Sequence, residues 1–254
     1  SDRLIPAIVR RHRQCSIRHR KEKNRRYSLC FFPLVGAVIG GLFLLWNIVS
    51  LRLKIGKFLY SAVSVTIPII VTGGIHIDGF CDVNDAKSAY GDKEKRFSIM
   101  KDSHIGTFAV LYLCVYLIFQ TALFSQMKTF SAAEITAVGY VLSRSLSAFS
   151  ALTFRSANPD GSLQNFVRPA HKKITMFAVI SWIIACTTAM VYIDFITGTV
   201  SFLTAIAVFF YYKKFAYKTF GGTTGDLCGW FLQVCEISIL TMAVFAEILG
   251  EYIK

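Results

Sequence analysis

Charged residues are scarce in this 254-residue sequence: they make up 17% of it, against 54% apolar residues and 14% aromatic residues. An ordinary soluble domain has about a quarter of its residues charged, so this composition argues against one. The seven cysteines form no CxxC pair, which argues against a zinc site or a disulfide framework and favours burial. What the sequence has instead is a series of apolar runs of about 18 residues or more, each long enough to cross a bilayer.

These runs predict an all-α, polytopic membrane bundle, since helices satisfy their own backbone hydrogen bonds in lipid. The candidate spans are residues 27–51, 58–74, 105–126, 131–154, 174–196, 198–212 and 228–248. The sixth is short for a full crossing, so we expect it to tilt little, to thin the bilayer locally or to be partly re-entrant. Without an internal repeat or a linker, residues 27–254 are expected to form one membrane domain that follows a basic arm, residues 1–26.

The basic arm indicates the orientation of the bundle. It holds ten Lys or Arg residues against Asp2 and Glu22, and so contributes +8 of the net charge of +13. Positive residues before a span mark the cytoplasmic side, and we favour this interpretation over nucleic-acid binding. Loops 75–104, 155–173 and 213–227 would share that side. The opposite loops are short, but they contain Arg52, Lys54, Lys57 and Lys128, which weakens the bias without reversing it.

An aspartate-rich segment follows the second candidate span. If residues 74–89 are helical, Asp78, Asp82 and Asp85 stand at i, i+4 and i+7, within an arc of roughly 60°. Three carboxylates on one face repel each other unless a cation lies among them, and Mg²⁺ shares its coordination shell with substrate phosphates. The spacing therefore predicts one Mg²⁺, or two ions about 4 Å apart, beside a phosphorylated ligand. The alternative is a solvated acidic loop, neutralised by the downstream residues Lys87, Lys93, Lys95, Arg96 and Lys101.

Residues around the aspartates permit several roles. Gly73, Gly74 and Gly79 allow close approach of backbone or ligand. His76 lies about 200° from Asp78 on a helix, so it need not share the face of the aspartates. Its candidate roles are a base, a ligand or a packed histidine, and packing is the simplest of the three. Near the third span, Asp102 is either a helix cap or a fourth carboxylate for a second metal, and Ser103 is a candidate cap.

Further polar residues mark the later spans. The turn Gly221-Gly222-Thr223-Thr224-Gly225-Asp226 enters the last span, where backbone N–H groups bind phosphate or the turn is simply flexible. Arg144 and Glu236 lie inside spans and must face the bundle interior. Arg144 suits a phosphate, and Glu236, near Gln233, suits a polar substrate; an internal Arg144–Glu236 ion pair is equally consistent with the sequence.

These motifs resemble those of the cobalamin synthases, also called adenosylcobinamide-GDP ribazoletransferases. The resemblance rests on FFPLVGAVIGGL at Phe31–Leu42, TGGIHIDGFCDVNDA at Thr72–Ala86, IMKDSHIGTF at Ile99–Phe108, LSR at Leu142–Arg144, GGTTGD at Gly221–Asp226 and QVCE at Gln233–Glu236. It extends from about Tyr27 to the C-terminus. The most specific part is the H-x-D-G-x-x-D-x-x-D pattern of His76–Asp85 together with IMKDS. The first 26 residues fit poorly.

The resemblance implies the last step of nucleotide-loop assembly in vitamin B12, at the inner membrane of a prokaryote. In that step the ribose 3′-hydroxyl of α-ribazole, or of its 5′-phosphate, attacks adenosylcobinamide-GDP and releases GMP, with Mg²⁺ as cofactor. The family's acidic motif maps onto Asp78, Asp82 and Asp85. Combined with the residues above, this predicts catalytic roles for Asp82, His76 and Arg144; metal ligands Asp78, Asp82, Asp85, Asp102 and Asp226; and substrate contacts from Gly73, Gly74, Gly79, Lys101, Ser103, Gly221, Gly222, Thr223, Gly225, Gln233 and Glu236.

Two other functions share features with this sequence. A CDP-alcohol phosphotransferase of lipid synthesis also holds metal on helix-borne aspartates, but its D-G-x-x-A-R opening is absent, because Phe80-Cys81-Asp82-Val83 follows Asp78-Gly79. A divalent-cation transporter would favour acidic residues near the bilayer midplane, whereas these cluster at one surface. Membrane lipid and the two substrates are the expected partners, nucleic acid is not, and a homo-oligomer is compatible with the sequence.

Overall fold

The computed structural model of the chain describes residues 26–89, 91–102 and 104–253. The basic arm, apart from Arg26, and Ser103 therefore lie outside the described residues. Inside them the chain is helical without a strand, and the helices are α2 (Ser28–Arg52), α3 (Lys57–Thr72), α4 (Ile75–Ser88), α5 (Lys93–Met100), α6 (Thr107–Gln126), α7 (Phe130–Thr153), α8 (Gln164–Val167), α9 (Lys172–Ile193), α10 (Phe195–Phe220) and α11 (Gly225–Ile253).

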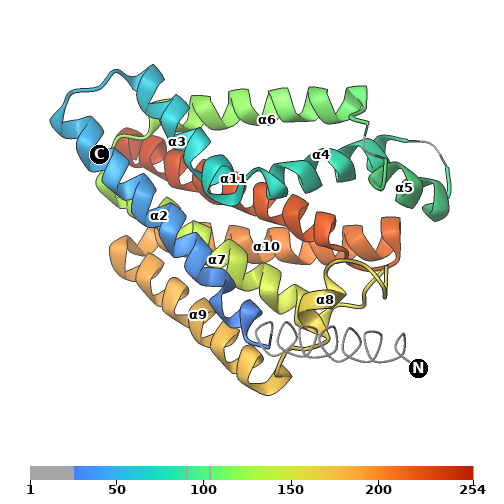
Figure 1. Ribbon diagram of the computed structural model, residues 1–254. Helices are drawn as coiled ribbons and strands as arrows, with labels where there is room; N and C mark the ends of the chain where they lie inside the picture. The colour runs from blue at the N-terminus through green and yellow to red at the C-terminus, as the bar shows by residue number, and fades with distance from the viewer. Residues whose placement is uncertain (1–25, 90, 103, 254) are drawn as a thin grey trace, which may run out of the picture.

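The long helices form the expected membrane bundle. Among the described residues, α2, α6, α7, α9, α10 and α11 are long and apolar enough to cross a bilayer. α3 and α4 pass the same test only as a pair, bent by 95° at a short break, and would form a seventh crossing. In Figure 1 these elements lie side by side, and α3 and α4 together cover the length of one crossing. The structure thus confirms a polytopic helical membrane protein.

The sixth crossing differs from the expectation of a short span. α10 extends over 26 residues and includes Lys213, Lys214 and Lys218. Hydropathy falls at these lysines, which is why the sequence predicts an end near residue 212. The helix continues because Lys is a good helix former, and positive charge near a helix C-terminus is stabilising.

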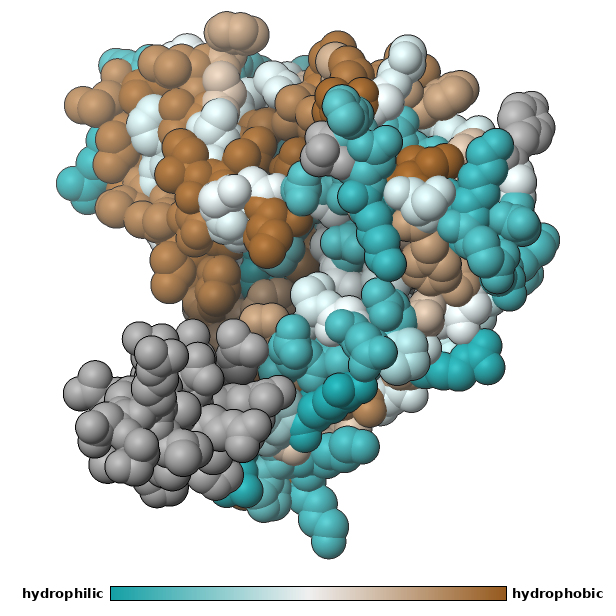
Figure 2. All heavy atoms as spheres, turned by 45° about the vertical axis from the view of Figure 1, so that its right-hand side comes forward, coloured by the Kyte–Doolittle hydropathy of each residue, from teal (hydrophilic) through white to brown (hydrophobic). Residues whose placement is uncertain are grey.

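The two ends of the bundle differ in polarity. α5, α8 and the connection between α10 and α11 lie at one end, and the α2–α3 and α6–α7 connections lie at the other (Figure 1). Figure 2 shows hydrophilic residues gathered over the first end, whereas hydrophobic residues cover most of the other half of the visible face. We call the end that carries α5 and α8 the polar end. Among the described residues, α5, α8 and the α10–α11 connection thus gather at one end of the bundle.

α7 is the central helix of the bundle and the most buried of the six described helices long enough to cross a bilayer, with 78% of an 18-residue stretch buried. Small residues let its neighbours approach closely: a Cβ atom added at Gly36 of α2 would overlap the Tyr140 carbonyl, and one at Gly40 would lie 2.7 Å from the Ala137 oxygen. Such contacts replace the hydrophobic effect as the packing force between helices in lipid. α7 and α2 together fix one wall of the site described next.

Candidate functional site

The break between α3 and α4 aims the aspartate helix. Gly73 and Gly74 both adopt left-handed conformations, with φ of 62° and 79°. Gly73 ends α3, and Gly74 is the N-cap of α4. Residues with a Cβ rarely adopt this conformation, so two consecutive glycines permit the sharp turn. The predicted role of Gly73 and Gly74 in substrate contact stays a prediction, but their backbone role is visible.

α4 packs unusually closely on the start of α11. A Cβ atom at Gly79 would lie 2.8 Å from the Asp226 carbonyl oxygen and 3.0 Å from its Cα. One turn later in α11, a Cβ at Gly229 would lie 3.3 Å from the His76 carbonyl oxygen. The close approach expected at Gly79 is therefore made by the backbone of α11. It brings Asp226 beside the aspartates of α4.

Gly79→Ala tests this contact. The added methyl group meets backbone, which cannot rotate away, so we expect α4 to shift and the protein to lose about 1–3 kcal/mol of stability. Thermal unfolding of the purified protein in detergent measures the loss. Gly41→Ala is the matched control, because a Cβ there meets nothing within 4 Å. Equal melting temperatures for the two variants would contradict the close packing of α4 on α11.

The carboxylates of Asp78, Asp82 and Asp226 gather beside this contact. As the periodicity predicts, Asp78, Asp82 and Asp85 lie on one helix, α4, of which Asp78 is exposed and Asp82 half-buried. The charged neighbours that act on Asp82 are, in order of effect, Asp78, Asp226 and Asp85. Asp82 therefore lies within electrostatic reach of three other carboxyl groups, which repel its negative charge. A cation or a bound proton would relieve that repulsion.

Asp85 has a structural task in addition. Its carboxylate accepts hydrogen bonds from the backbone N–H groups of Gly106 and Ala109, the latter at 2.8 Å. These are unsatisfied groups at the N-terminus of α6, where a negative charge is favourable. Asp85 therefore ties α4 to α6, a role that the spacing of the aspartates does not reveal.

Asp102 is engaged with His104. The His104 ring donates to its carboxylate at 2.7 Å, and this hydrogen bond lowers the pKa of Asp102 below its usual value. Its carboxylate also accepts from the His104 backbone N–H. The structure places Asp102 in a local turn at the polar end.

No three His, Cys, Asp or Glu side chains in the described part of the chain are arranged to enclose a metal ion. The donor set nevertheless suits Mg²⁺, which usually takes only one or two protein carboxylates and completes its shell with water and substrate phosphates. Asp78, Asp82 and Asp226 are carboxylates of that kind. The predicted magnesium site stays a prediction.

The glycine-rich turn before α11 is held by backbone pairing to residues 155–157. Thr223 N–H donates to the Arg155 carbonyl, and Ala157 N–H donates to the Thr223 carbonyl, both at 2.9 Å. The Arg155 guanidinium donates to the Gly221 carbonyl at 2.7 and 3.0 Å. Gly222 packs against this strand-like segment so closely that a Cβ would overlap the Arg155 carbonyl. The turn is thus anchored on both sides, and it fixes Gly225 and Asp226 at the rim of the site.

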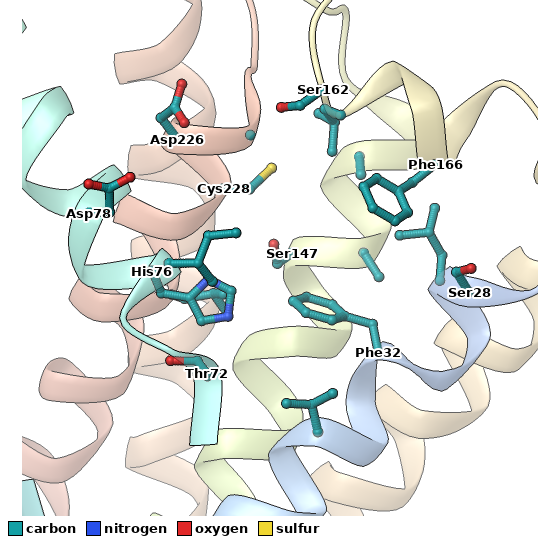
Figure 3. Close-up of a pocket in the computed structure, with 18 residues that line it drawn as sticks. Ser28, Phe32, Thr72, His76, Asp78, Ser147, Ser162, Phe166, Asp226 and Cys228 are labelled. Carbon is teal, nitrogen blue, oxygen red and sulfur yellow. The ribbon is translucent and has the colours of Figure 1, made fainter. Parts of the chain in front are cut away.

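Two cavities meet at this rim. The larger, about 460 Å³, has mostly apolar walls from α2, α4, α7, α8 and α11, with His76, Asp78 and Asp226 among its polar residues. Phe32 and Phe166 lie on one side of this cavity, and Asp78 and Asp226 lie on the opposite side (Figure 3). The His76 ring lies between the two phenylalanines and the two aspartates. The smaller, about 190 Å³, contains Lys101, Asn158 and Thr224. Both are lined by Ser162, Leu163, Gly225 and Asp226, so they share one wall.

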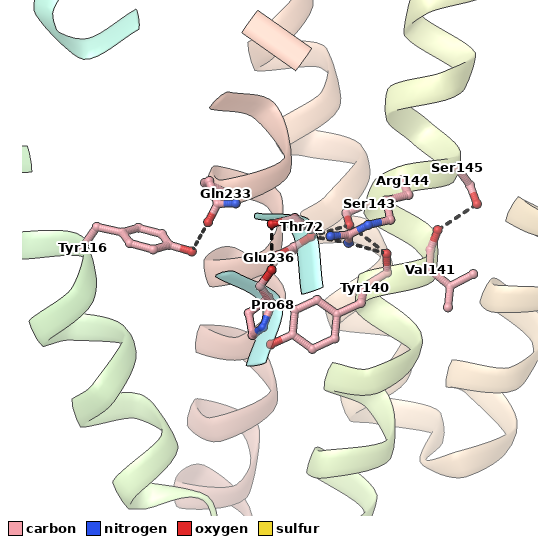
Figure 4. A network of polar contacts seen from close by, with 10 residues as sticks. All are labelled: Pro68, Thr72, Tyr116, Tyr140, Val141, Ser143, Arg144, Ser145, Gln233 and Glu236. Atoms are coloured by element: carbon pink, nitrogen blue, oxygen red, sulfur yellow. Dashed lines mark hydrogen bonds and ion pairs between the residues drawn. The ribbon is translucent and has the colours of Figure 1, made fainter. Parts of the chain in front are cut away.

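Arg144 and Glu236 form an ion pair in the bundle interior. The Arg144 guanidinium donates to Glu236 at 2.7 Å and to the Tyr140 carbonyl at 2.9 Å, and the Ser143 hydroxyl donates to Glu236 at 3.0 Å (Figure 4). Arg144 is 1% exposed and lines neither cavity. Of the two alternatives that the sequence left open, the structure shows the ion pair.

The remaining predicted residues divide between cavity and core. His76 and Lys101 line the larger and the smaller cavity, respectively. Gln233 is buried and accepts a hydrogen bond from the Tyr116 hydroxyl at 2.6 Å. The aromatic residues Phe32 and Phe166 of the larger cavity were not predicted from the sequence. Phe32 lies within a family motif, but nothing in an apolar helix separates a cavity residue from a lipid-facing one.

Comparisons with known proteins agree with these observations. The model of the cobalamin-5-phosphate synthase family matches residues 5–244. This range includes most of the basic arm, residues 1–26, in which we found little resemblance to the family's motifs. The chain is 40% identical over 227 residues to an adenosylcobinamide-GDP ribazoletransferase of Lachnoclostridium phytofermentans, covering 89% of this chain and 87% of that protein. It is 31% identical to the protein of that name from Clostridium kluyveri, covering 91% and 90%. No solved structure matches significantly.

Proposed function

The chain belongs to the cobalamin-5-phosphate synthase family, and from this premise we propose that it is an adenosylcobinamide-GDP ribazoletransferase acting at the polar end of the bundle. The structural observation that supports this function is the shared wall of the two cavities at Asp226, beside Asp78 and Asp82. A transferase of this kind must hold two substrates next to each other at a phosphoryl group. Two adjoining cavities beside a carboxylate cluster meet that requirement.

The larger cavity suits α-ribazole. Small-ligand sites are typically about 300–1,000 Å³, mostly apolar, with a few polar groups that fix orientation, and this cavity of about 460 Å³ fits that description. Phe32, Phe166 and the His76 ring offer aromatic surfaces to a flat base. The ribose would then point toward Asp78 and Asp226. The smaller cavity, with Lys101, suits the diphosphate of adenosylcobinamide-GDP.

The proposed reaction is one displacement at phosphorus. The ribose 3′-oxygen forms a bond to the cobinamide-side phosphorus, the bond from that phosphorus to the bridging oxygen breaks, and GMP leaves with the oxygen. Asp82 accepts the hydroxyl proton, because a proton there relieves repulsion from its carboxylate neighbours. Asp78 and Asp226 would hold Mg²⁺, which when bound neutralises charge on the diphosphate oxygens. Positioning by the two cavities supplies the remainder of the catalysis.

The cytoplasmic surface of a prokaryotic inner membrane is the proposed location of the polar end. The loops at this end carry the basic residues that mark the cytoplasmic side. The N-terminus is then cytoplasmic.

The function is tested with protein purified in detergent, Mg²⁺, adenosylcobinamide-GDP and α-ribazole. We expect adenosylcobalamin and GMP, separated by chromatography. Release of CMP from a CDP-alcohol under the same conditions, without cobalamin formation, would support the phosphotransferase of lipid synthesis instead. Divalent-metal flux into proteoliposomes, without turnover of either substrate, would support a transporter.

Phe32→Ala tests the placement of α-ribazole. Loss of one aromatic contact is expected to raise the KM for α-ribazole by roughly 10-fold and to leave the KM for adenosylcobinamide-GDP unchanged. Phe31→Ala is the matched control, because Phe31 is its neighbour in α2 but is 61% exposed and lines no part of the cavity. An equal rise for both substrates, or the same change in both variants, would contradict the placement.

A further inference from the structure

The wall that the two cavities of the site share contains one neutral polar side chain. Four residues line both cavities: Ser162, Leu163, Gly225 and Asp226. Leu163 is apolar, Gly225 has no side chain, and Asp226 carries a carboxylate. In the proposed reaction the transferred phosphoryl group lies at this wall, where the two substrates meet. Ser162 is therefore the residue of the wall whose side chain offers a neutral hydrogen-bond donor to that group.

The Ser162 hydroxyl is open to a ligand. Ser162 is exposed at the rim, and within the described parts of the chain its hydroxyl makes no hydrogen bond. Nearby hydroxyls are engaged instead: Ser156 donates to the Asn158 carbonyl at 2.9 Å, and Thr224 accepts from the Leu227 N–H at 3.2 Å. Unlike them, the Ser162 hydroxyl is left for a ligand at the rim.

Glycine at position 225 leaves space beside this hydroxyl. A Cβ atom at Gly225 would lie 3.0 Å from Ser162 Oγ. Gly225 is not among the described glycines with positive φ, so its backbone conformation does not require glycine. In Figure 3 the Ser162 oxygen points toward the side of the cavity on which Asp226 lies. A phosphoryl oxygen can therefore approach the hydroxyl where a larger residue at position 225 would stand.

The loop that carries Ser162 is held by backbone hydrogen bonds. The Ser162 carbonyl accepts from the Asn165 N–H at 3.1 Å, and the Ala157 N–H donates to the Thr223 carbonyl at 2.9 Å. The second bond joins this loop to the glycine-rich turn that ends at Asp226. The two polar residues of the shared wall are thus connected through paired backbone. A donor held in this way needs no reorganisation at the moment of reaction.

We propose that the Ser162 hydroxyl donates a hydrogen bond to a non-bridging oxygen of the phosphoryl group that is transferred. This inference rests on the function proposed above. The hydroxyl keeps its proton and forms no covalent bond, so the displacement at phosphorus is unchanged. The carboxylates of the site repel an anionic phosphoryl oxygen, and Lys101 lines only the smaller cavity. Ser162 supplies a donor where the cavities meet, and a hydrogen bond to a charged oxygen is stronger than one between neutral groups.

Ser162→Ala tests this contact in the full-length protein, assayed with Mg²⁺, adenosylcobinamide-GDP and α-ribazole. We expect kcat to fall roughly 10-fold, because a hydrogen bond that orients the phosphoryl group for in-line attack is lost. The KM of each substrate should stay unchanged, since most of its contacts lie elsewhere in its cavity. The melting temperature should also be retained, because the hydroxyl is exposed and makes no hydrogen bond within the described residues.

Two further serine variants show whether the effect is specific to this position. Ser98→Ala is the matched control, because Ser98 is an exposed serine of α5 at the polar end and lines neither cavity. It should behave like the wild type. Ser147 is buried and lines the larger cavity alone, so Ser147→Ala should change only the KM of α-ribazole.

Sulfur substitution at the transferred phosphorus reports on the hydrogen bond itself. Sulfur replaces one non-bridging oxygen of the cobinamide-side phosphoryl group in adenosylcobinamide-GDP, and the two diastereomers are assayed separately. Sulfur is a weak acceptor, so the wild-type protein should turn over the diastereomer whose sulfur faces Ser162 more slowly than the unmodified substrate. In Ser162→Ala this disadvantage should shrink, because the donor is already absent.

The contact is contradicted by a wild-type kcat in Ser162→Ala, or by sulfur effects identical to those of the wild type. A rise in the KM of α-ribazole alone, as expected for Ser147→Ala, would place the hydroxyl against the base instead. A lower melting temperature with unchanged kcat per folded molecule would assign Ser162 a structural role. Failure of the wild-type protein to form adenosylcobalamin would contradict the proposed function itself, and this inference with it.

Discussion

Replacement of Asp82 by Asn is expected to lower turnover by about 100-fold or more, which is the usual contribution of a positioned acid or base. Asn preserves the size of the side chain but cannot accept the proton of the attacking hydroxyl. Because the substitution removes a carboxylate that three neighbouring carboxyl groups repel, the protein should be at least as stable as the wild type. The expected combination is therefore lost activity with a retained melting temperature, measured as initial rates and thermal unfolding in the same detergent.

Glu94→Gln is the matched control for this variant. It makes the same chemical change at an exposed position of α5, also at the polar end, and should turn over at the wild-type rate. Wild-type turnover in a folded Asp82→Asn protein would remove Asp82 from the chemistry. Mn²⁺ binding, followed by electron paramagnetic resonance, separates its roles: unchanged binding in the inactive variant indicates a base, and lost binding indicates a metal ligand.

Replacement of Arg144 by Met is expected to cost about 3–5 kcal/mol of stability, because it leaves the Glu236 carboxylate buried without its charged partner. Adding Glu236→Gln removes the unpaired charge and should recover most of the loss. The double-mutant cycle, measured by thermal unfolding, should thus show strong coupling between these two positions.

Activity distinguishes this structural role from substrate binding. Since Arg144 lines neither cavity, turnover per folded molecule should fall far less in Arg144→Met than in Asp82→Asn. Arg168→Met is the control for removing an arginine from an ion pair, because its partner Asp160 is exposed and such pairs contribute about 1 kcal/mol or less. Full stability with a severe loss of turnover in Arg144→Met would contradict the structural role and would indicate that Arg144 binds a phosphate group of the substrate.

Local patterns predicted the parts of this protein that depend on local physics. Hydropathy located the six helices that are long enough to cross a bilayer, although it placed the end of α10 too early and treated α3 as a complete span. Asp78, Asp82 and Asp85 share one helix, α4, which is the condition under which their spacing puts them on one face. Two adjacent glycines, Gly73 and Gly74, mark a break where only glycine adopts the required conformation easily. These features follow from helical periodicity and backbone conformation alone.

Features that depend on neighbours distant in the sequence were not predictable in the same way. Asp85 caps α6 because the fold brings the start of that helix to it, and nothing beside Asp85 in the sequence indicates this contact. The choice between ligand and ion pair for Arg144 depended on whether α7 and α11 place it beside Glu236. Phe32 becomes a cavity residue only because α2 packs across from α4 and α8.

The most direct test of the proposed reaction follows the phosphorus atom that is transferred. Adenosylcobinamide-GDP labelled with ³²P only at the cobinamide-side phosphorus is incubated with the purified protein, Mg²⁺ and α-ribazole, and the products are separated. The proposed displacement predicts that all transferred label appears in adenosylcobalamin and that the released GMP is unlabelled. Label released as GDP, or label in inorganic phosphate without cobalamin, would contradict attack by the ribose hydroxyl at that phosphorus.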